Sequence, residues 1–349
     1  MNRMNVWVIM GGMSSEREVS LTSGRAVAQA LRQRGHGVWA YELSSGQFLG
    51  GESTDLPPGL PSVEVLPAAP GAGDPGWAAR LLTTAGTLCG RADVAFLALH
   101  GGAGENGTIQ ALLSSAGMPY TGSGPRASAV AMDKALTKWI MEAVEVPTPS
   151  WQLISIQGDK AFPPASGLPA PPALPAVVKP AAEGSSVGVT LVGEPGEWEP
   201  DVRAAWEAAE RTQGEPVRIL AEAYIPGREL TVSVLGDRAL PVVEILPKDG
   251  FYDYRNKYTK GRAEYRAPAD LGTIEARRLQ EHSVRLFRTL GCRGMARADF
   301  RLTPQGEAYC LEINTIPGLT SLSLLPMAAA ADGIEFGALL EEICRLAGC

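Results

Sequence analysis

The sequence predicts an α/β protein of two or three domains whose first third folds around a parallel sheet. Apolar, strand-like runs lie at 5–10, 38–43 and 94–99, and helical runs follow at about 16–34 and 108–116. Strands that alternate with helices in this way form a parallel sheet with crossover helices. A chain of 349 residues can bury a large core and is long enough to divide into two or three domains.

A second and a third unit are expected after this sheet. A helical run at 128–144 ends before a Val-Pro pair, and a proline-rich stretch at 163–175 predicts an extended surface loop. The second unit is expected to contain strands at 176–180 and 189–192 and a helix near 197–211. The third is expected to contain strands at 218–225, 228–236 and 239–246, a helix near 274–290, a hairpin and a terminal helix.

Composition argues against several functional classes. The net charge is −7 and no basic block is visible, so neither nucleic acid nor an anionic membrane is an expected partner. The first apolar run is too short for a signal peptide or a membrane span. The five cysteines are odd in number and show no CxxC spacing, which predicts reduced thiols in a cytoplasmic protein.

The expected hairpin joins two runs, 295–300 and 309–314, in which polar residues interrupt apolar ones. Alternation places Arg297 and Asp299 on one face of the first run. It places Cys310, Glu312 and Asn314 on one face of the second. A turn at 305–306 then pairs Asp299 with Glu312 and Arg297 with Asn314.

Directly opposed carboxylates repel each other unless a positive charge lies between them. One explanation is a hard divalent cation such as magnesium, which binds one or two protein carboxylates and completes its shell with water and phosphate oxygens. The other is a solvated face on which Arg297 neutralises both Asp299 and Glu312. The hairpin alone favours neither explanation.

Two loops follow strands of the predicted parallel sheet, where ligands of such sheets gather. In the first loop, Ser15 and Glu18 have capping-box spacing, and Glu16 could either answer the helix dipole or bind a substrate ammonium. This loop lacks the GxGxxG spacing of a dehydrogenase. In the second, His100 precedes several glycines that let a ligand approach the backbone, and it is equally compatible with a structural or a binding role.

Three further segments are compatible with a ligand site or with ordinary surface. Lys179 precedes a glycine- and serine-rich loop at 183–188 whose amides could surround phosphate oxygens. Glu222 and Glu229 flank a strand and a turn, where carboxylates are common. A cluster of aromatic and charged residues at 251–261 is either a solvated loop or a lid that closes on a ligand.

Taken in chain order, the segments that carry these residues resemble the D-alanine–D-alanine ligase family of the ATP-grasp superfamily. The resemblance extends from residue 5 to about residue 330 and is specific because the motifs occur as an ordered set. They are GGMSSEREVSLTSG, LHGGAGENGTIQ, PYTGSG, MDKALTKW, VVKPAAEGSSVGV, EAYIPGRE, FYDYRNKYT, ARADF and LEINTIPGLTSLSLLPM.

This resemblance implies a three-domain ATP-grasp architecture. It implies an N-terminal α/β substrate-binding domain at 1–124, a central ATP-grasp subdomain at 125–221, and a C-terminal subdomain at 222–349 that carries the lid and the metal site. The implied reaction uses ATP to phosphorylate the carboxylate of one D-alanine. The amine of a second D-alanine attacks the acyl phosphate, which gives the dipeptide used for peptidoglycan precursors. The implied cofactors are ATP and two Mg²⁺ ions, for which Mn²⁺ can substitute, and the implied state is a cytoplasmic homodimer.

The resemblance also implies a role for each site residue. The metal ligands are Asp299, Glu312 and Asn314, with Glu312 bridging the two ions. The nucleotide ligands are Lys134, Lys179 and Lys257 at the phosphates, Glu222, Ala223, Tyr224 and Ile225 at the adenine, and Glu229 at the ribose. Glu16 receives the first D-alanine's ammonium near Val19 and His100, and Arg297 stabilises the oxyanion with the backbone of Gly318. Ser323 and Leu324 line the second pocket, and Ser185 and Tyr258 latch the lid against Glu16.

Two other functions stay open on the sequence. A D-alanine–D-lactate ligase would accept a hydroxyl in place of the second amine, but lactate-using relatives commonly lack the tyrosine at 258. A nucleotide-binding ATP-grasp protein without turnover would have no need of an oxyanion stabiliser. The presence of Arg297 beside Asp299, Glu312 and Asn314 argues against that reading.

Overall fold

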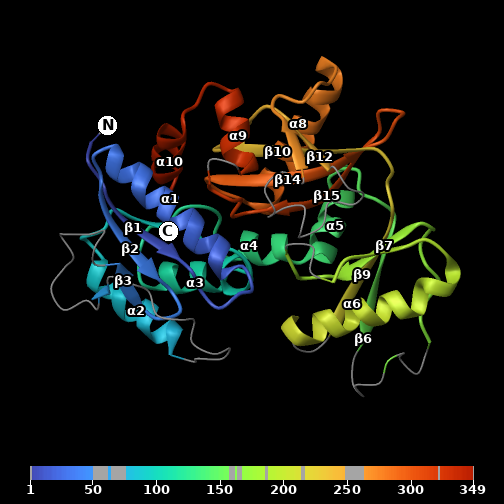
Figure 1. The fold of residues 1–349 in the computed structure, drawn as a ribbon, viewed down its shortest axis with the longest axis horizontal. Helices are drawn as coiled ribbons and strands as arrows, with labels where there is room; N and C mark the ends of the chain where they lie inside the picture. Colours follow the sequence, from blue (N-terminus) through green and yellow to red (C-terminus); the bar gives the residue numbers. More distant parts are fainter. Residues whose placement is uncertain are drawn as a thin grey trace.

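The structure is a computed structural model of the chain. It describes residues 2–49, 62–63, 76–156, 162, 167–184, 188–213, 217–247, 263–320 and 323–348. Three sheets organise these residues. Figure 1 shows the first sheet with its helices in blue and cyan, the second in green and yellow, and the third in orange. Within these ranges, no helix is both long and apolar enough to cross a membrane.

The first sheet has the strand order β4-β3-β2-β1-β5. Its strands are β1 Asn5–Met10, β2 Gly37–Glu42, β3 Gln47–Leu49, β4 Ser62–Val63 and β5 Val94–Leu97. As predicted, β1 pairs in parallel with β2 and β5, whereas β3 is antiparallel to β2. Alternate residues of β1 enter two cores: Val6 and Val8 pack against α1 (Arg17–Gln33), and Trp7 and Ile9 pack against α2 (Trp77–Leu88) and α3 (Thr108–Ser115).

The second sheet has the order β6-β9-β7-β8 and is antiparallel. Its strands are β6 Trp151–Ile156, β7 Ala176–Pro180, β8 Thr190–Val192 and β9 Val217–Ala223. Helix α6 (Trp198–Gln213) follows the short 3-10 helix η3 (Pro195–Glu197) and covers one face of this sheet. Its Trp206 packs in one core with Val178 of β7 and Ile219 of β9. The expectation that the run at 218–225 begins the third unit is wrong, because β9 pairs with β6 and β7.

The third sheet is also antiparallel, with the order β13-β12-β10-β14-β15 and β11 beside β10. Its strands are β10 Arg228–Leu235, β11 Arg238–Ala239, β12 Val243–Pro247, β13 Ala263–Arg266, β14 Met295–Leu302 and β15 Ala308–Asn314. Helix α8 (Thr273–Leu290) covers the face that carries Ala296, Ala298 and Phe300. The alternate residues of β14 therefore face the opposite side, toward the second sheet.

The hairpin of β14 and β15 has the predicted register at its polar end. Asp299 lies opposite Glu312, and Arg297 lies opposite Asn314. The two carboxylates are therefore cross-strand neighbours on one face of the sheet, and a positive charge is needed beside them to offset their repulsion.

A β-bulge interrupts the hairpin directly after this pair. Phe300 is paired with Cys310, so Leu311 is the extra residue on β15. The prediction that Cys310 shares a face with Glu312 is wrong, because Cys310 packs with Phe300 in the core. Leu311, which was expected on the opposite face, lines the same cleft as Glu312.

Three helix predictions also need correction. The run at 128–144 forms two helices, α4 (Pro125–Met132) and α5 (Lys134–Ala143), because Asp133 is extended and its side chain caps α5. The capping box of Ser15 and Glu18 is absent: Glu16 is the N-cap residue of α1, and no side chain caps this helix. The single terminal helix is a pair, α9 (Leu324–Ala331) and α10 (Phe336–Arg345).

An ion-pair cluster fastens α10 to the turn between α1 and β2. Arg34 Nη2 lies 2.7 Å from Glu341 Oε2, and His36 Nε2 lies 3.0 Å from Glu341 Oε1. The hydrogen bond from Arg34 is the largest cause that lowers the pKa of Glu341 to about 2, and the contact with His36 adds to it against the opposing effect of burial. The C-terminal helix is thereby bound to the helical side of the first sheet.

Replacing Glu341 by Gln should lower the melting temperature at neutral pH by a few degrees. Because the folded pKa of Glu341 lies below the ordinary value of 4.5, the stabilisation is complete above about pH 4.5 and is lost as the pH falls toward 2. The difference in unfolding free energy between wild type and Glu341→Gln should therefore shrink between pH 6 and pH 3. Denaturant titrations at several pH values measure it, with the neighbouring Glu342→Gln as the matched control. A difference that is independent of pH would contradict the assignment.

Candidate active site

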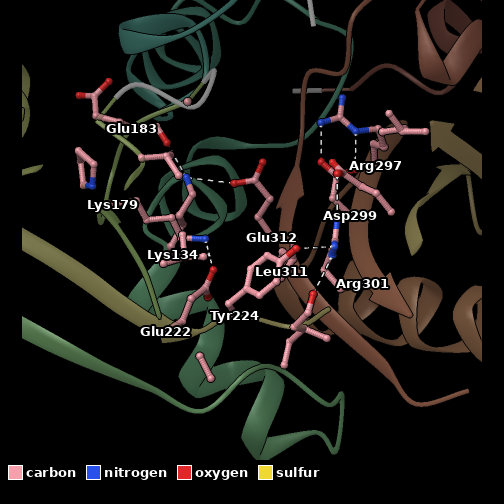
Figure 2. A pocket seen from close by; sticks show the side chains of 18 of the residues that line it. Lys134, Lys179, Glu183, Glu222, Tyr224, Arg297, Asp299, Arg301, Leu311 and Glu312 are labelled. Carbon is pink, nitrogen blue, oxygen red and sulfur yellow. Dashed lines mark hydrogen bonds and ion pairs between the residues drawn. The ribbon is translucent and has the colours of Figure 1, made fainter. Parts of the chain in front are cut away.

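A cleft with an empty volume of about 1050 Å³, counted to its open mouth, lies between the second and the third sheet. Each sheet turns the face away from its covering helix toward the cleft. Figure 2 shows charged side chains from both sides pointing into it. Eleven of the predicted site residues line the cleft: Lys134, Lys179, Glu222, Ala223, Tyr224, Ile225, Glu229, Arg297, Asp299, Glu312 and Leu324.

Each carboxylate of the hairpin pair has its own cation. Arg297 donates from Nε and Nη2 to the two oxygens of Asp299, both at 2.8 Å, and Thr231 Oγ1 donates to Asp299 Oδ1 at 2.7 Å. Lys134 Nζ lies 3.1 Å from Glu312 Oε2. Arg297 therefore pairs with Asp299, and Lys134 supplies a second positive charge at Glu312.

The oxygen atoms around this pair suit a hard cation. Two carboxylates in register and the carboxamide of Asn314, one position further along the same face, are the donor types that magnesium prefers. Among the described residues, Asp299 Oδ2 accepts a hydrogen bond from Arg297 only, so it keeps acceptor capacity. No group of three or more His, Cys, Asp or Glu that could hold a metal occurs among the described residues. Magnesium usually binds one or two protein carboxylates and completes its shell with water and phosphate oxygens, so this carboxylate pair suits a metal that binds together with a phosphate.

Opposite the hairpin, three buried charged residues form ion pairs on the side of the cleft that carries Lys179, which we call the lysine wall. Glu222 on β9 lies between Lys179 of β7 and Lys138 of α5, with Lys138 Nζ 2.7 Å from Glu222 Oε2. Burial alone would raise the pKa of Glu222, but Lys179 and Lys138 outweigh it and lower the pKa below its ordinary value. Glu222 is therefore a carboxylate that two lysines keep charged, although its Oε2 is paired with Lys138 by proximity and not by hydrogen-bond geometry.

Arg301 closes the other end of the cleft. It donates from Nε to the carbonyl oxygen of Ile225 at 3.1 Å and from Nη1 to Glu229 Oε2 at 3.3 Å. Its guanidinium also lies 5.6 Å from the ring centroid of Tyr224. The segment that was predicted to hold the adenine and the ribose is thus fixed in place by one arginine from β14.

Loops that follow strands β1 and β5 of the first sheet lie next to the cleft. A β-carbon placed on Gly184, in the loop that follows β7, would lie 3.6 Å from Glu16 Oε2, and one placed on Gly101 would lie 2.9 Å from the same atom. A β-carbon on Gly318 would lie 2.9 Å from Ser323 Oγ and 4.0 Å from His100 Cε1. The loops of the first and second sheets therefore meet at Glu16, which is only 6% exposed, and the loop after the third sheet reaches His100.

The histidine of this group is held on both sides. His100 Nε2 lies 3.2 Å from Ser23 Oγ of α1, and His100 Nδ1 lies 3.8 Å from Glu105 Oε1. Ser14 Oγ donates to the His100 carbonyl oxygen at 2.5 Å, which joins the two glycine-rich loops. Val19 lies on α1, between Glu16 and Ser23 in the sequence.

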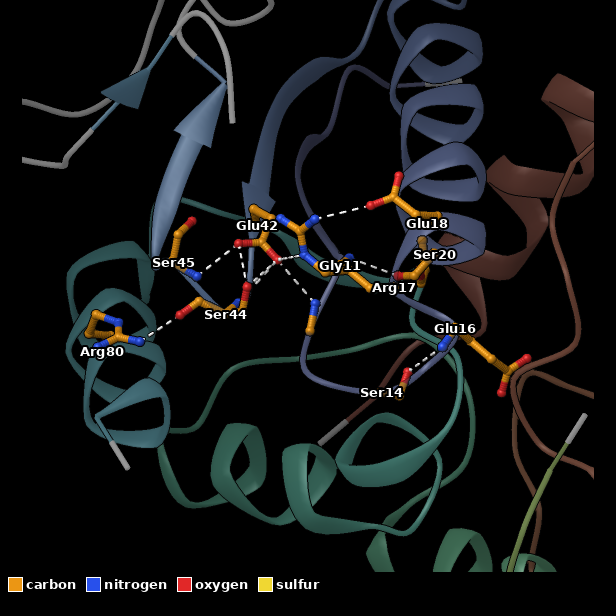
Figure 3. A network of polar contacts seen from close by, with 12 residues as sticks. Gly11, Ser14, Glu16, Arg17, Glu18, Ser20, Glu42, Ser44, Ser45 and Arg80 are labelled. Carbon is orange, nitrogen blue, oxygen red and sulfur yellow. Dashed lines mark hydrogen bonds and ion pairs between the residues drawn. The ribbon is translucent and has the colours of Figure 1, made fainter. Parts of the chain in front are cut away.

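A buried carboxylate supports the loop that carries Glu16. Glu42 at the end of β2 is fully buried and accepts hydrogen bonds from the backbone N–H of Gly12 at 3.1 Å and of Ser45 at 2.8 Å. Ser44 and Arg17 also donate to it. Burial opposes ionisation, but the hydrogen bonds from Ser44, Ser45 and Gly12 prevail and lower the pKa of Glu42. Figure 3 shows this network beside Glu16, whose side chain points away from it.

Three predicted residues, Ser185, Lys257 and Tyr258, lie outside the described residues. Sequence reasoning missed others that the structure brings to the site: Arg301, Lys138, Thr231, Glu105 and Glu42. For two of these residues, the sequence pattern was enough to predict their position. Arg301 continues the alternation of Arg297 and Asp299, and Lys138 lies one helical turn after Lys134.

Comparison with known proteins gives one family throughout. The family model described as D-ala D-ala ligase N-terminus matches residues 5–123, and the one described as D-ala D-ala ligase C-terminus matches residues 140–345. A D-alanine–D-alanine ligase of Aquifex aeolicus is 41% identical over 340 residues, which are 97% of this chain and 99% of the relative. One of Syntrophotalea carbinolica is 40% identical, over 98% of this chain and 96% of the relative.

A solved structure agrees with the sequence relatives. The crystal structure of D-alanine–D-alanine ligase from Bacillus anthracis in complex with ATP superposes with a TM-score of 0.72 at 27% identity. The match covers 98% of this chain and 97% of that structure. The predicted α/β fold of ATP-grasp type and the predicted resemblance are both confirmed. The chain belongs to the D-alanine–D-alanine ligase family.

Proposed function

We propose that this chain is an ATP-dependent, ADP-forming D-alanine–D-alanine ligase, which makes D-alanyl-D-alanine for peptidoglycan precursors. One observation carries the proposal: the cleft between the sheets has cationic groups on both walls and an opposed pair of carboxylates between them. Cations suit the phosphates of a nucleotide, and the carboxylate pair suits the metal that accompanies them. Family membership supports the same reading and names the substrate class of the relatives.

The reaction requires two substrates to meet beside the nucleotide. A carboxylate oxygen of the first D-alanine attacks the γ-phosphorus of ATP, and ADP leaves. The amine of the second D-alanine then attacks the carbonyl carbon of the acyl phosphate, and phosphate leaves as the peptide bond forms. Phosphoryl transfer spreads negative charge over oxygens, so catalysis depends on positioning and on fixed positive charge.

Lys134 and Lys179 are proposed to face the phosphates, because both ammonium groups line the cleft. The adenine is proposed to bind at 222–225 and the ribose at Glu229, and Arg301 contacts both parts of this segment. Asp299, Glu312 and Asn314 would hold magnesium, which when bound supplies positive charge to the phosphate oxygens. The ammonium of Lys134 lies on Glu312 and must share that carboxylate with the metal.

The D-alanine sites are proposed where the loops of the first domain adjoin the cleft. The Glu16 carboxylate is proposed to receive the first ammonium, beside Val19 and His100. Arg297 and the Gly318 backbone are proposed to stabilise the oxyanion, and a preformed pair of donors serves that purpose well. Ser323 and Leu324, at the start of α9, are proposed to line the second pocket.

Replacing Glu42 by Gln should impair use of D-alanine more than use of ATP. Gln keeps one oxygen and turns its NH2 group toward the N–H of either Gly12 or Ser45, which loses its acceptor, so the loop that carries Glu16 shifts. A displacement of about 1 Å in a positioning group can cost up to about a hundredfold in kcat/KM. Steady-state kinetics with each substrate varied tests this, with Glu18→Gln as the control because Glu18 also pairs with Arg17 but is exposed. An equal effect on both substrates would contradict a role in the D-alanine site.

The experiment that tests the function is ADP release with D-alanine alone, with L-alanine alone, and with D-alanine together with D-lactate. A D-alanine–D-alanine ligase releases ADP with D-alanine alone and forms the dipeptide. Release that requires D-alanine together with D-lactate would make the chain a D-alanine–D-lactate ligase. Nucleotide binding without ADP release under any of these conditions would make it a binding protein.

The assembly and the location rest on the resemblance alone. We propose a homodimer in the cytoplasm, divided into domains at 1–124, 125–221 and 222–349. Light scattering of the purified chain tests the dimer, and a monomer at micromolar concentration would exclude it. Limited proteolysis tests whether cleavage falls near the two proposed boundaries.

A further inference from the structure

Lys138 on α5 is a buried charged residue that the proposed reaction does not use. Its side chain is 0% exposed and lies behind the residues that line the cleft. Burial lowers the pKa of Lys138, and the carboxylate of Glu222 counteracts part of that effect. Burying an ammonium is costly unless it is paired and hydrogen-bonded, so its contacts should indicate why it is there.

Lys138 contacts one wall of the cleft directly and is connected to the other through Thr148. On one side its Nζ lies 2.7 Å from Glu222 Oε2 on β9, and Glu222 Oε1 is bound by Lys179. On the other side Nζ lies 2.6 Å from Thr148 Oγ1, whose only hydrogen goes to the carbonyl oxygen of Cys310 at 2.9 Å. The threonine must therefore accept from Lys138. The carbonyl of Cys310 belongs to the bulge of β15, two residues before Glu312.

We propose that Lys138 is a positioning residue for the nucleotide phosphates, which acts by neutralising Glu222 so that the charge of Lys179 is directed into the cleft. This inference rests on the proposed function. Lys179 and Glu222 alone form a neutral pair, and a neutral pair attracts phosphate weakly. With Lys138 the three groups carry one net positive charge, and Lys179 is the member of the group that lines the cleft together with Glu222.

The contact with Thr148 gives the same lysine a second task. It connects β9 in the second sheet with β15 in the third, the two strands that carry Glu222 and Glu312. The side chain of Lys138 thus links the side of the cleft that carries Lys179 to the side that carries Glu312. The charge effect and the connection can be separated, because Thr148→Val removes the connection and leaves all three charges.

The test compares the affinities of ADP and adenosine by calorimetry in EDTA, so that only protein groups meet the phosphates. In Lys138→Met the ratio of ADP affinity to adenosine affinity should fall about ten- to hundredfold, as expected for one charge removed near the phosphates. Adenosine carries no phosphate, so its affinity measures any change at the adenine, where Glu222 is also proposed to bind, and the ratio isolates the effect on the phosphates. An unchanged ratio in Lys138→Met, with normal wild-type binding, would overturn this inference alone. Failure of wild type to bind ADP would overturn the proposed function and the inference with it.

Two further variants exclude a role in packing only. Thr148→Val should keep the ratio within about threefold of wild type, and a loss as large as that of Lys138→Met would overturn the charge explanation. The double variant Lys138→Met with Glu222→Gln removes one charge of each sign, so its ratio should return to the wild-type value. This variant keeps the net charge of the wild-type cluster, with Lys179 as its remaining charge, so it also tests the charge explanation if Lys138→Met does not fold. A ratio that stays tenfold or more below wild type would overturn the inference.

Discussion

Glu312→Gln should lose magnesium-dependent turnover by about a hundredfold or more, the effect expected when a fixed charge at a phosphoryl-transfer site is removed. Glu312 and Asp299 are the opposed carboxylates of the hairpin, and Gln leaves only one negative charge to hold the metal. The substitution keeps the size of the side chain, so the loss should come from charge and not from packing.

The fold of Glu312→Gln should remain intact. In the structure, Lys134 offsets the charge of Glu312 at 3.1 Å, and a partly exposed ion pair of this kind contributes at most about 1 kcal/mol. The melting temperature without ligands should therefore stay close to that of wild type. Glu307→Gln, on the same hairpin but outside the cleft, is the matched control for turnover. Near-normal magnesium-dependent ADP release by Glu312→Gln would refute the metal assignment.

Arg297→Lys should lower kcat by about 10²- to 10³-fold, the usual effect of removing one oxyanion donor. Lys keeps the positive charge beside Asp299 but cannot reproduce the two-pronged contact that Arg297 makes at 2.8 Å. If Arg297 acts on the oxyanion, the KM for ATP should change little. The kcat and the KM for ATP of this variant measure the two effects separately.

Arg301→Lys provides the comparison within the same strand. Arg301 contacts the segment proposed for the adenine and the ribose, so its replacement should raise the KM for ATP by about two- to tenfold and leave kcat nearly unchanged. Arg297→Lys is therefore expected to lower kcat with little effect on the KM for ATP, and Arg301→Lys is expected to do the reverse. The assignment of Arg297 fails if Arg297→Lys also acts mainly on the KM for ATP.

The fold was predictable where a pattern is local. Alternation in β14 and the turn before β15 were enough to pair Asp299 with Glu312. The bulge was not predictable, because Cys310 and Leu311 are both apolar and either could have entered the core. The break at Asp133 was hidden for a related reason: the residues around it favour a helix, and Asp133 is held by Arg218 from β9, which is distant in sequence.

The candidate site shows the same limit. Glu16, Arg297 and Asp299 lie in short motifs, and the sequence was enough to single them out. Glu42 ends an apolar strand, and only the folded chain brings it to the amides of Gly12 and Ser45. Whether a buried charge is a ligand or a support depends on its partners, and these come from other parts of the chain.

In the proposed reaction, ATP activates the carboxylate of the first D-alanine within this cleft. The most direct test uses D-alanine labelled with ¹⁸O in its carboxylate, together with ATP and magnesium, and mass analysis of the phosphate released. One labelled oxygen should appear in the phosphate for each dipeptide formed, because the carboxylate oxygen that attacks phosphorus leaves with it. Dipeptide formation with unlabelled phosphate would contradict the claim.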